Sequence, residues 1–241
     1  MSGAIIIGAG PGIGTSVARR VAREGLTVGL IARSQDTIDG ALGALDGADA
    51  FGVLADVTDE VGLRAALDVL MDRYGLPELL VYNVARIQWD GIGELTAGDH
   101  LEAWAVNVVG AITAVSHVAP LMAMAGAGTI VLTGGMPEPV PELTSLSLGK
   151  AGVRALTKLL STAYRSSGVH VATVTVAGTV APGTPFDPDA IAEHYWRLHS
   201  QPVGAWEQGI VHTGREARVQ AAETSAVARA ARIPVTSTWT P

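Results

Sequence analysis

Apolar runs alternate with amphipathic stretches along most of the chain. Short aliphatic runs predict strands at residues 4–8, 27–32, 51–55, 78–82, 129–133, 169–176 and 207–212. Between them, apolar positions three or four apart predict helices at residues 12–24, 36–45, 58–74, 100–124, 146–166 and 189–199. Continuously apolar strands separated by helices are typical of a parallel sheet that is buried on both faces. The pattern therefore predicts an α/β fold: one Rossmann-type, doubly wound parallel sheet with helices on both faces.

This predicted domain spans residues 1–212, and no linker or internal repeat divides it. The tail, residues 213–241, has a different composition, rich in alanine with interspersed arginines. We expect it to form a loose helix or to remain disordered.

Composition narrows the function classes. Hydrophobic residues make up 48% of the 241 residues and charged residues 16%, which predicts a large aliphatic core. The formal net charge of −7 argues against a nucleic-acid partner. The chain has no cysteine, which excludes disulfides and thiol catalysis and fits a cytoplasmic protein. The N-terminus lacks the basic region of an export signal, and no leader is expected.

One uncharged stretch, residues 103–137, is long enough to suggest a membrane span. Polar and helix-breaking residues interrupt it, including Asn107, His117 and Pro120. We interpret it as a buried helix followed by a buried strand, and expect no membrane partner.

A glycine-rich turn joins the first predicted strand to the first predicted helix. It has glycine at Gly8, Gly12 and Gly14. Such a turn lets the backbone approach a pyrophosphate, and the amides at the helix start face the anion. Gly12 allows the close approach, and Gly14 allows tight packing of helix on strand. The sequence therefore predicts a dinucleotide site.

The end of the second strand bears on which dinucleotide binds. NAD sites usually have a carboxylate here for the ribose hydroxyls, but this chain has Ala32. The next residue, Arg33, is a permanent cation able to bind a 2′-phosphate, and Ser34 can add a hydrogen bond. The sequence favours NADP(H), with NAD(H) less favoured.

Several spaced elements together resemble the short-chain dehydrogenase/reductase family, over about residues 1–212. The glycine spacing G-x-x-x-G-x-G is similar to the family's turn. The further matches, in chain order, are Ala55-Asp56-Val57, Tyr82-Asn83-Val84-Ala85, Asn107 in a predicted helix, Lys150 in Ser147-Leu148-Gly149-Lys150, and Ala177-Gly178-Thr179-Val180. The resemblance implies a nicotinamide-dependent oxidoreductase acting on a small molecule.

The resemblance also implies roles for individual residues. Lys150 would hold ribose, Asn107 would organise a water, and Asp56 and Val57 would flank adenine. The other implied cofactor-binding residues are Gly8, Gly12, Ile13, Gly14, Asn83, Gly178 and Val180. A segment at about residues 183–205 would form a substrate lid.

The two long helices, residues 100–124 and 146–166, resemble the pair through which the family forms dimers, so we expect a homodimer or homotetramer. On the first of them, Trp104, Val108, Val115 and Leu121 are candidates for the subunit interface.

The family's proton-donating tyrosine is missing. It stands four residues before the lysine, or seven in some enoyl reductases, where this chain has Leu146 and Leu143. The partner serine aligns with Gly134 or Gly135 by strand end, and with Thr133 by counting back from Leu146. Of these three aligned positions, only Thr133 has a hydroxyl. The retained catalytic candidates are therefore Asn107, Lys150 and Thr133.

Three interpretations remain open. The protein is a reductase with another acid, for which the candidates are Ser145, Ser147, Thr133, Tyr195 and a water relayed by Lys150. Alternatively, it binds NADP(H) without turnover, as a sensor or partner subunit. In the third, hydride goes to a polarised alkene or an iminium, whose protonation needs little help. We expect no metal site, because His194 and His199 are five residues apart, a poor helical pair for a metal.

Overall fold

The computed structural model describes residues 3–214 and contains one seven-stranded parallel sheet of strand order β3-β2-β1-β4-β5-β6-β7. The strands are β1 (Gly3–Ile7), β2 (Thr27–Ala32), β3 (Ala50–Leu54), β4 (Leu79–Tyr82), β5 (Gly128–Gly135), β6 (Val169–Val176) and β7 (Gly209–His212). The predicted α/β architecture is confirmed. Most of the predicted tail, from residue 215 onward, lies outside the described residues.

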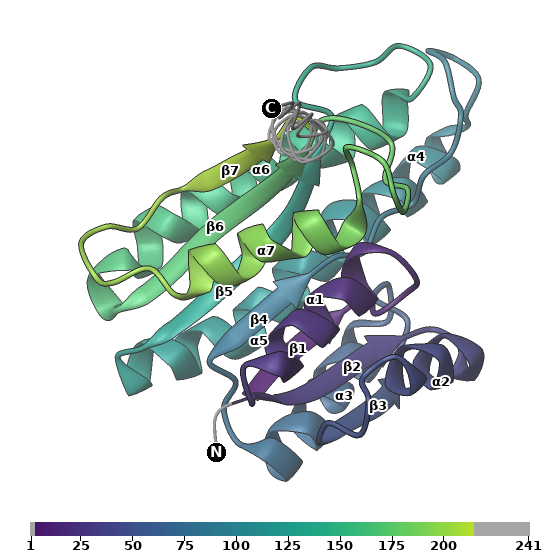
Figure 1. Ribbon diagram of the computed structural model, residues 1–241. Coiled ribbons are helices and arrows are strands. Elements are labelled where there is room, and N and C mark those ends of the chain that lie inside the picture. The colour runs from purple at the N-terminus through teal and green to yellow at the C-terminus, as the bar shows by residue number, and fades with distance from the viewer. Residues whose placement is uncertain (1–2, 215–241) are drawn as a thin grey trace, which may run out of the picture.

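Helices cover both faces of the sheet (Figure 1). One face carries α1 (Ile13–Arg23), α2 (Gln35–Gly43) and α7 (Pro188–His199), whose apolar residues share one buried cluster. The other carries α3 (Glu60–Tyr74), α5 (Gly110–Ala125) and α6 (Thr144–Tyr164), which share a second cluster. A short 3-10 turn, η2 (Arg165–Ser167), follows α6.

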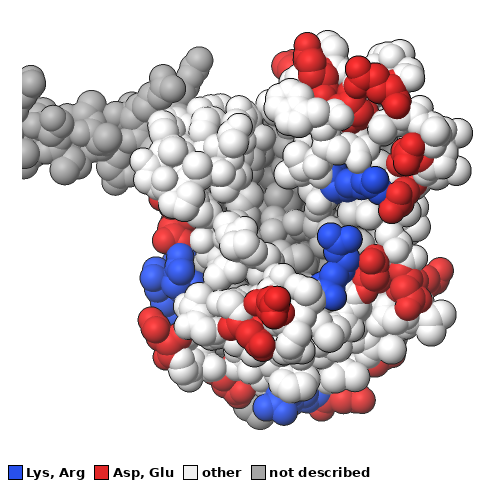
Figure 2. Space-filling model, turned by 90° about the vertical axis from the view of Figure 1, so that its right-hand side faces the viewer, with Lys and Arg blue, Asp and Glu red and all other residues white. Residues whose placement is uncertain are grey.

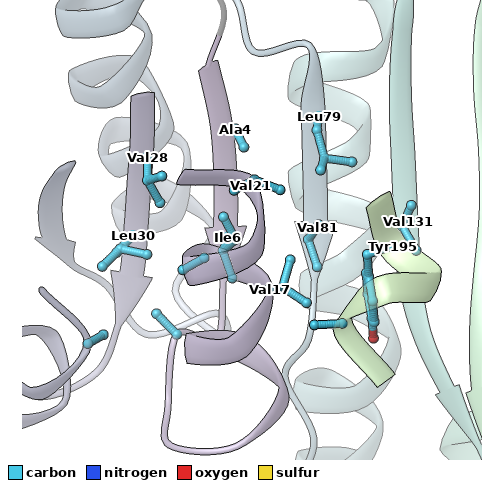
Figure 3. Packing of buried hydrophobic residues seen from close by; sticks show 14 of the residues in the cluster. Ala4, Ile6, Val17, Val21, Val28, Leu30, Leu79, Val81, Val131 and Tyr195 are labelled. Carbon is cyan, nitrogen blue, oxygen red and sulfur yellow. The ribbon is translucent and has the colours of Figure 1, made fainter. Parts of the chain in front are cut away.

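Side chains alternate across the sheet, as they must along a strand. In β1, Ile6 packs under α1 and α7, whereas Ile5 and Ile7 pack under α3 and α5. Figure 3 shows Val17 of α1 and Tyr195 of α7 lying over the first of these surfaces. Burial on both faces explains why the strands have no polar alternation.

The predicted helix 100–124 is longer and less regular than expected. It consists of α4 (Ala97–Trp104), a π-helical turn η1 (Ala105–Val109) and α5. Thr96 and Asp99 form a capping box, which explains the earlier start. The run Ala97–Ala125 is long and apolar enough to cross a membrane, yet half of its most apolar window is buried inside the fold, as in a core helix.

Asp59 caps α3, because the Asp59 side chain accepts a hydrogen bond from the Gly62 amide. One prediction about the subunit interface is wrong. On the long helices, Val108 and Val115 face the interior of the subunit rather than a partner. Leu121 and Trp104 remain partly exposed.

Candidate active site

A cleft of about 1270 Å³ lies at the carboxyl ends of the strands. Strand order reverses between β1 and β4, and such a switch point is where doubly wound sheets bind ligands. Figure 2 shows this face hollowed, with basic side chains beside the hollow. Predicted site residues lining the cleft are Gly8, Gly12, Ile13, Arg33, Ser34, Asp56, Val57, Asn83, Thr133, Lys150, Gly178 and Val180.

The glycine turn has the geometry that its sequence requires. Gly8 and Gly12 have φ angles of 89° and 105°, a region that strains other residues. Gly14 lies behind the cleft, where an added Cβ would stand 2.1 Å from the Gly8 carbonyl oxygen. No side chain caps the start of α1, so the helix N-terminus faces the cleft through its backbone.

The end of the cleft beyond β2 and β3 combines one cation with one anion. Arg33 lines it next to Ser34, whose hydroxyl caps α2 by accepting from the Thr37 amide at 3.3 Å. Across from them, Asp56 accepts hydrogen bonds from the amide and hydroxyl of Thr58. These bonds lower the pKa of Asp56, with a smaller contribution from Arg33. The carboxylate therefore stays ionised at neutral pH.

Lys150 lies at the floor of the cleft with only 5% of its surface exposed. Its Nζ donates a hydrogen bond to the Thr133 carbonyl oxygen at 2.8 Å. Burial lowers the pKa of Lys150 to about 8. One helical turn earlier, Leu146 lines the same cleft. An amine that changes charge near neutral pH therefore stands beside an apolar wall.

The Thr133 hydroxyl has two partners away from Lys150. It donates to Asn83 Oδ1 at 2.9 Å and lies 2.7 Å from the Tyr195 hydroxyl, which must then be the donor of that bond. Asn83 in turn donates from Nδ2 to the Gly8 carbonyl oxygen. Tyr195 is fully buried in the α1–α7 cluster and does not line the cleft. The structure therefore places Tyr195 outside the reach of a cleft-bound substrate.

The two serine candidates are also bonded elsewhere. Ser145 donates to the buried Asp90 carboxylate at 2.8 Å. Ser147 exchanges hydrogen bonds with the backbone of Val140. Neither serine lines the cleft. Ser145 thereby connects α6 to the segment between β4 and α4, and Ser147 connects it to the segment between β5 and α6.

Gly135, rather than Thr133, is the end-of-strand residue that faces Lys150. A Cβ built at Gly135 would lie 3.7 Å from Lys150 Cγ. The loop that follows is held by Arg154, whose guanidinium donates to the carbonyls of Gly135 and Met136 at 2.9 Å each. The sequence did not single out Arg154, although it follows Lys150 by one helical turn on the same helix.

Asn107 lies in the π turn and is fully buried. Its Oδ1 accepts from the Arg86 amide at 3.2 Å, and its Nδ2 donates to the Ala103 carbonyl at 2.9 Å. It does not line the cleft. In this arrangement the Asn107 side chain positions the segment after β4.

Arg86 is a cleft residue that sequence reasoning missed. Its guanidinium donates to Gln88 at 2.9 Å and pairs with Glu102 of α4 at 2.6 Å. The available signal was a cation directly after the Asn83-Val84-Ala85 element.

Helix α7, within the expected lid, packs on α1. Arg20 pairs with Glu193 at 2.8 Å, and Arg19 pairs with Asp189. Of the expected lid, only Pro188 lines the cleft, together with Pro182 just before it. Among residues 3–214, no group of three or more possible ligands could hold a metal ion.

Comparisons with known proteins agree with this geometry. The short chain dehydrogenase family profile matches residues 2–188. Cis-4-hydroxycyclohexanecarboxylate dehydrogenase of Sinomonas cyclohexanicum is 32% identical over 191 residues, covering 75% of this chain and 72% of that protein. A putative ketoacyl reductase of Streptomyces coelicolor is 30% identical over 210 residues, covering 82% and 78%. A crystal structure of an actinorhodin polyketide ketoreductase variant with NADPH superposes with a TM-score of 0.82 at 25% identity, covering 88% and 96%. The chain therefore belongs to the short-chain dehydrogenase family of oxidoreductases.

Proposed function

We propose that this protein is an NADP(H)-dependent oxidoreductase that transfers hydride to or from a small carbonyl, imine or activated alkene, with Lys150 in place of the missing tyrosine as proton donor. The observation that carries the proposal is the buried Lys150 amine on the floor of a cleft that begins at the glycine turn. Bound NADP(H) would supply the hydride. The named relatives act on a hydroxylated ring acid or, by their names, on ketoacyl groups, which agrees with a carbonyl or alcohol substrate.

Lys150 fits the role of acid by elimination and by its pKa. The hydroxyls of Thr133, Ser145, Ser147 and Tyr195 have other partners. A general acid works best when its pKa is near the working pH, and burial lowers that of Lys150 to about 8. The ammonium group can give a proton to a substrate oxygen directly or through one water.

The proposal is tested by following NADPH absorbance with a panel of ketones, cyclic imines and enones. Turnover of at least one class is expected. Tight NADPH binding with no turnover across the panel would instead support a sensor or partner subunit, a function favoured by Leu146 standing where the family has its tyrosine.

The preference for NADP(H) rests on Arg33 in the lining and on the absence of a carboxylate at Ala32. Arg33→Gln should reduce the ratio of NADPH to NADH affinity about tenfold, since a charge-assisted bond to phosphate contributes roughly that much. Fluorescence titration with both nucleotides measures the ratio. Arg73→Gln, which removes an arginine stacked on Phe51 outside the cleft, is the control. An unchanged ratio of NADPH to NADH affinity in Arg33→Gln would contradict the proposed binding of the 2′-phosphate by Arg33.

The proposed assembly is a homodimer or homotetramer in the cytoplasm. Exposed apolar side chains on α4, η1, α5 and α6 support an interface there, namely Leu101, Trp104, Val109, Ile112, Leu121, Leu148 and Leu159. Ile112→Glu should shift the mass measured by light scattering toward the monomer, because a buried unpaired charge opposes association. Val61→Glu, at an exposed position of α3, should leave the mass unchanged. A monomeric wild-type protein would contradict the proposal.

A further inference from the structure

The cleft that Lys150 lines also has several apolar lining residues. Besides Leu146, these are Ile87, Val106, Met136 and Pro182, and the charged residues Arg86 and Glu102 line the same cleft. The hydroxyls of Thr133, Ser145 and Ser147 are bonded to other groups of the protein. A bound molecule would therefore meet aliphatic surface over most of its body, and its polar groups would have few partners.

Arg86 also lines the cleft, with 31% of its side chain exposed. Its backbone amide is fixed by Asn107, and Asn107 packs against Gly149, the neighbour of Lys150. Asn107 thus contacts the backbone of Arg86 and the α6 residue that precedes Lys150. The other cleft arginine, Arg33, lies near Asp56 at the end of the cleft beyond β2 and β3.

The Arg86 guanidinium is held loosely enough to exchange its partner. Two of its N–H groups bind Gln88 and Glu102. The Glu102 side chain is 61% exposed, and an ion pair that is open to solvent contributes little to stability. A carboxylate entering the cleft would be less solvated than Glu102 and could accept two parallel N–H bonds from the planar fork. A substrate carboxylate can therefore replace Glu102 at the Arg86 guanidinium.

We infer that the protein selects substrates with an apolar body and one carboxylate, which Arg86 binds while the reacting carbon lies at Lys150. This inference rests on the proposed hydride transfer and specifies its substrate class. Glu102 keeps the arginine in position in the empty cleft and competes with the substrate for it.

The test compares a keto acid with its neutral analogue. The probes are 5-oxohexanoate and its methyl ester, measured for NADPH-dependent reduction and for quenching of protein-bound NADPH fluorescence. The wild type should favour the acid over the ester by about 10- to 100-fold, the net contribution of about one charge-assisted hydrogen bond once the displaced Glu102 pair is subtracted. Arg86→Gln should bring the ratio close to one. Glu102→Gln should lower the KM for the acid several-fold by removing the competing carboxylate.

A matched control is Arg23→Gln, which removes an exposed cation at the end of α1, outside the cleft. It should keep the wild-type ratio, which separates local binding from the change in net charge. Equal binding of acid and ester by the wild type would overturn the inference, whether or not either is reduced. Preferential binding of the acid that is lost in Arg86→Gln, without reduction of any panel substrate, would support the inference and contradict the proposed hydride transfer.

Discussion

Lys150→Met should lower kcat for reduction by about 10²- to 10⁴-fold, the usual contribution of a positioned general acid. Methionine approximates the length of the lysine chain and suits a buried site, so the fold should persist. The variant removes the titrating amine on the cleft floor, beside Leu146 and Gly135, neither of which can transfer a proton. The measurement is steady-state NADPH oxidation with the best panel substrate, alongside circular dichroism.

The pH profile gives a second readout of the same group. The acid form of Lys150 is the ammonium, so kcat/KM for reduction should fall as pH rises through about 8. Oxidation of the alcohol needs the neutral amine, so kcat/KM for oxidation should rise as pH rises through about 8. In Lys150→Arg the side chain stays charged at all accessible pH values, so this pH dependence of kcat/KM should disappear.

A control variant and a binding measurement test the Lys150 prediction. Lys158→Met changes an exposed lysine two turns later on α6 and should leave turnover unaffected. NADPH titration of Lys150→Met distinguishes chemistry from cofactor binding: a loss of affinity that accounts for the whole rate loss would leave only ribose binding for this lysine. Unchanged kcat would exclude the proposed mechanism.

Gly14→Ala should destabilise the fold by about 3 kcal/mol and weaken NADPH binding strongly. The added methyl would lie 2.1 Å from the Gly8 carbonyl oxygen and 3.0 Å from Ala9 Cα. Both neighbours are backbone atoms, so relief requires α1 to move away from β1. That movement displaces the helix N-terminus that faces the pyrophosphate, and each 1.4 kcal/mol lost there is about tenfold in affinity.

Urea unfolding and fluorescence titration with NADPH measure both effects. The control is Gly40→Ala in the middle of α2, where an added Cβ meets no atom within 4 Å. There alanine should stabilise the helix by up to about 1 kcal/mol and leave NADPH affinity unchanged. A Gly14→Ala protein with wild-type stability would mean that α1 does not pack on the turn as described.

The sheet was predictable because each of its central strands is apolar on both faces, a signal that needs no tertiary information. Helix starts were less predictable. The α3 cap is Asp59 rather than its neighbour Thr58, and both residues are good caps. Which of two adjacent side chains reaches the free amide depends on backbone angles that the sequence pattern does not reveal.

For the site, residues bound through backbone geometry were the easier part. The glycine turn and the segment at Asp56 lie on the cleft as expected. The direction of a hydroxyl was not predictable: counting back from Leu146 aligns Thr133 with the family's serine, but the Thr133 hydroxyl is bonded to Asn83 and Tyr195. Arg86 was missed because its relation to Asn107 joins segments about twenty residues apart, a contact that only the folded helix reveals.

The π turn at Ala105–Val109 sets which faces of α4 and α5, the two halves of one long helix, point toward the rest of the protein. Each residue of an α-helix rotates the following residues by about 100° around the helix axis. The wider π turn takes up one extra residue, so the helical segments before and after it keep their faces. α5 can thereby keep its apolar stripe on the sheet while α4 turns Glu102 toward the cleft. Deleting one residue within this turn, with Asn107 kept, would let the helix return to regular winding with both halves still on their surfaces, whereas a deletion within α4 or α5 would rotate one half by about 100°.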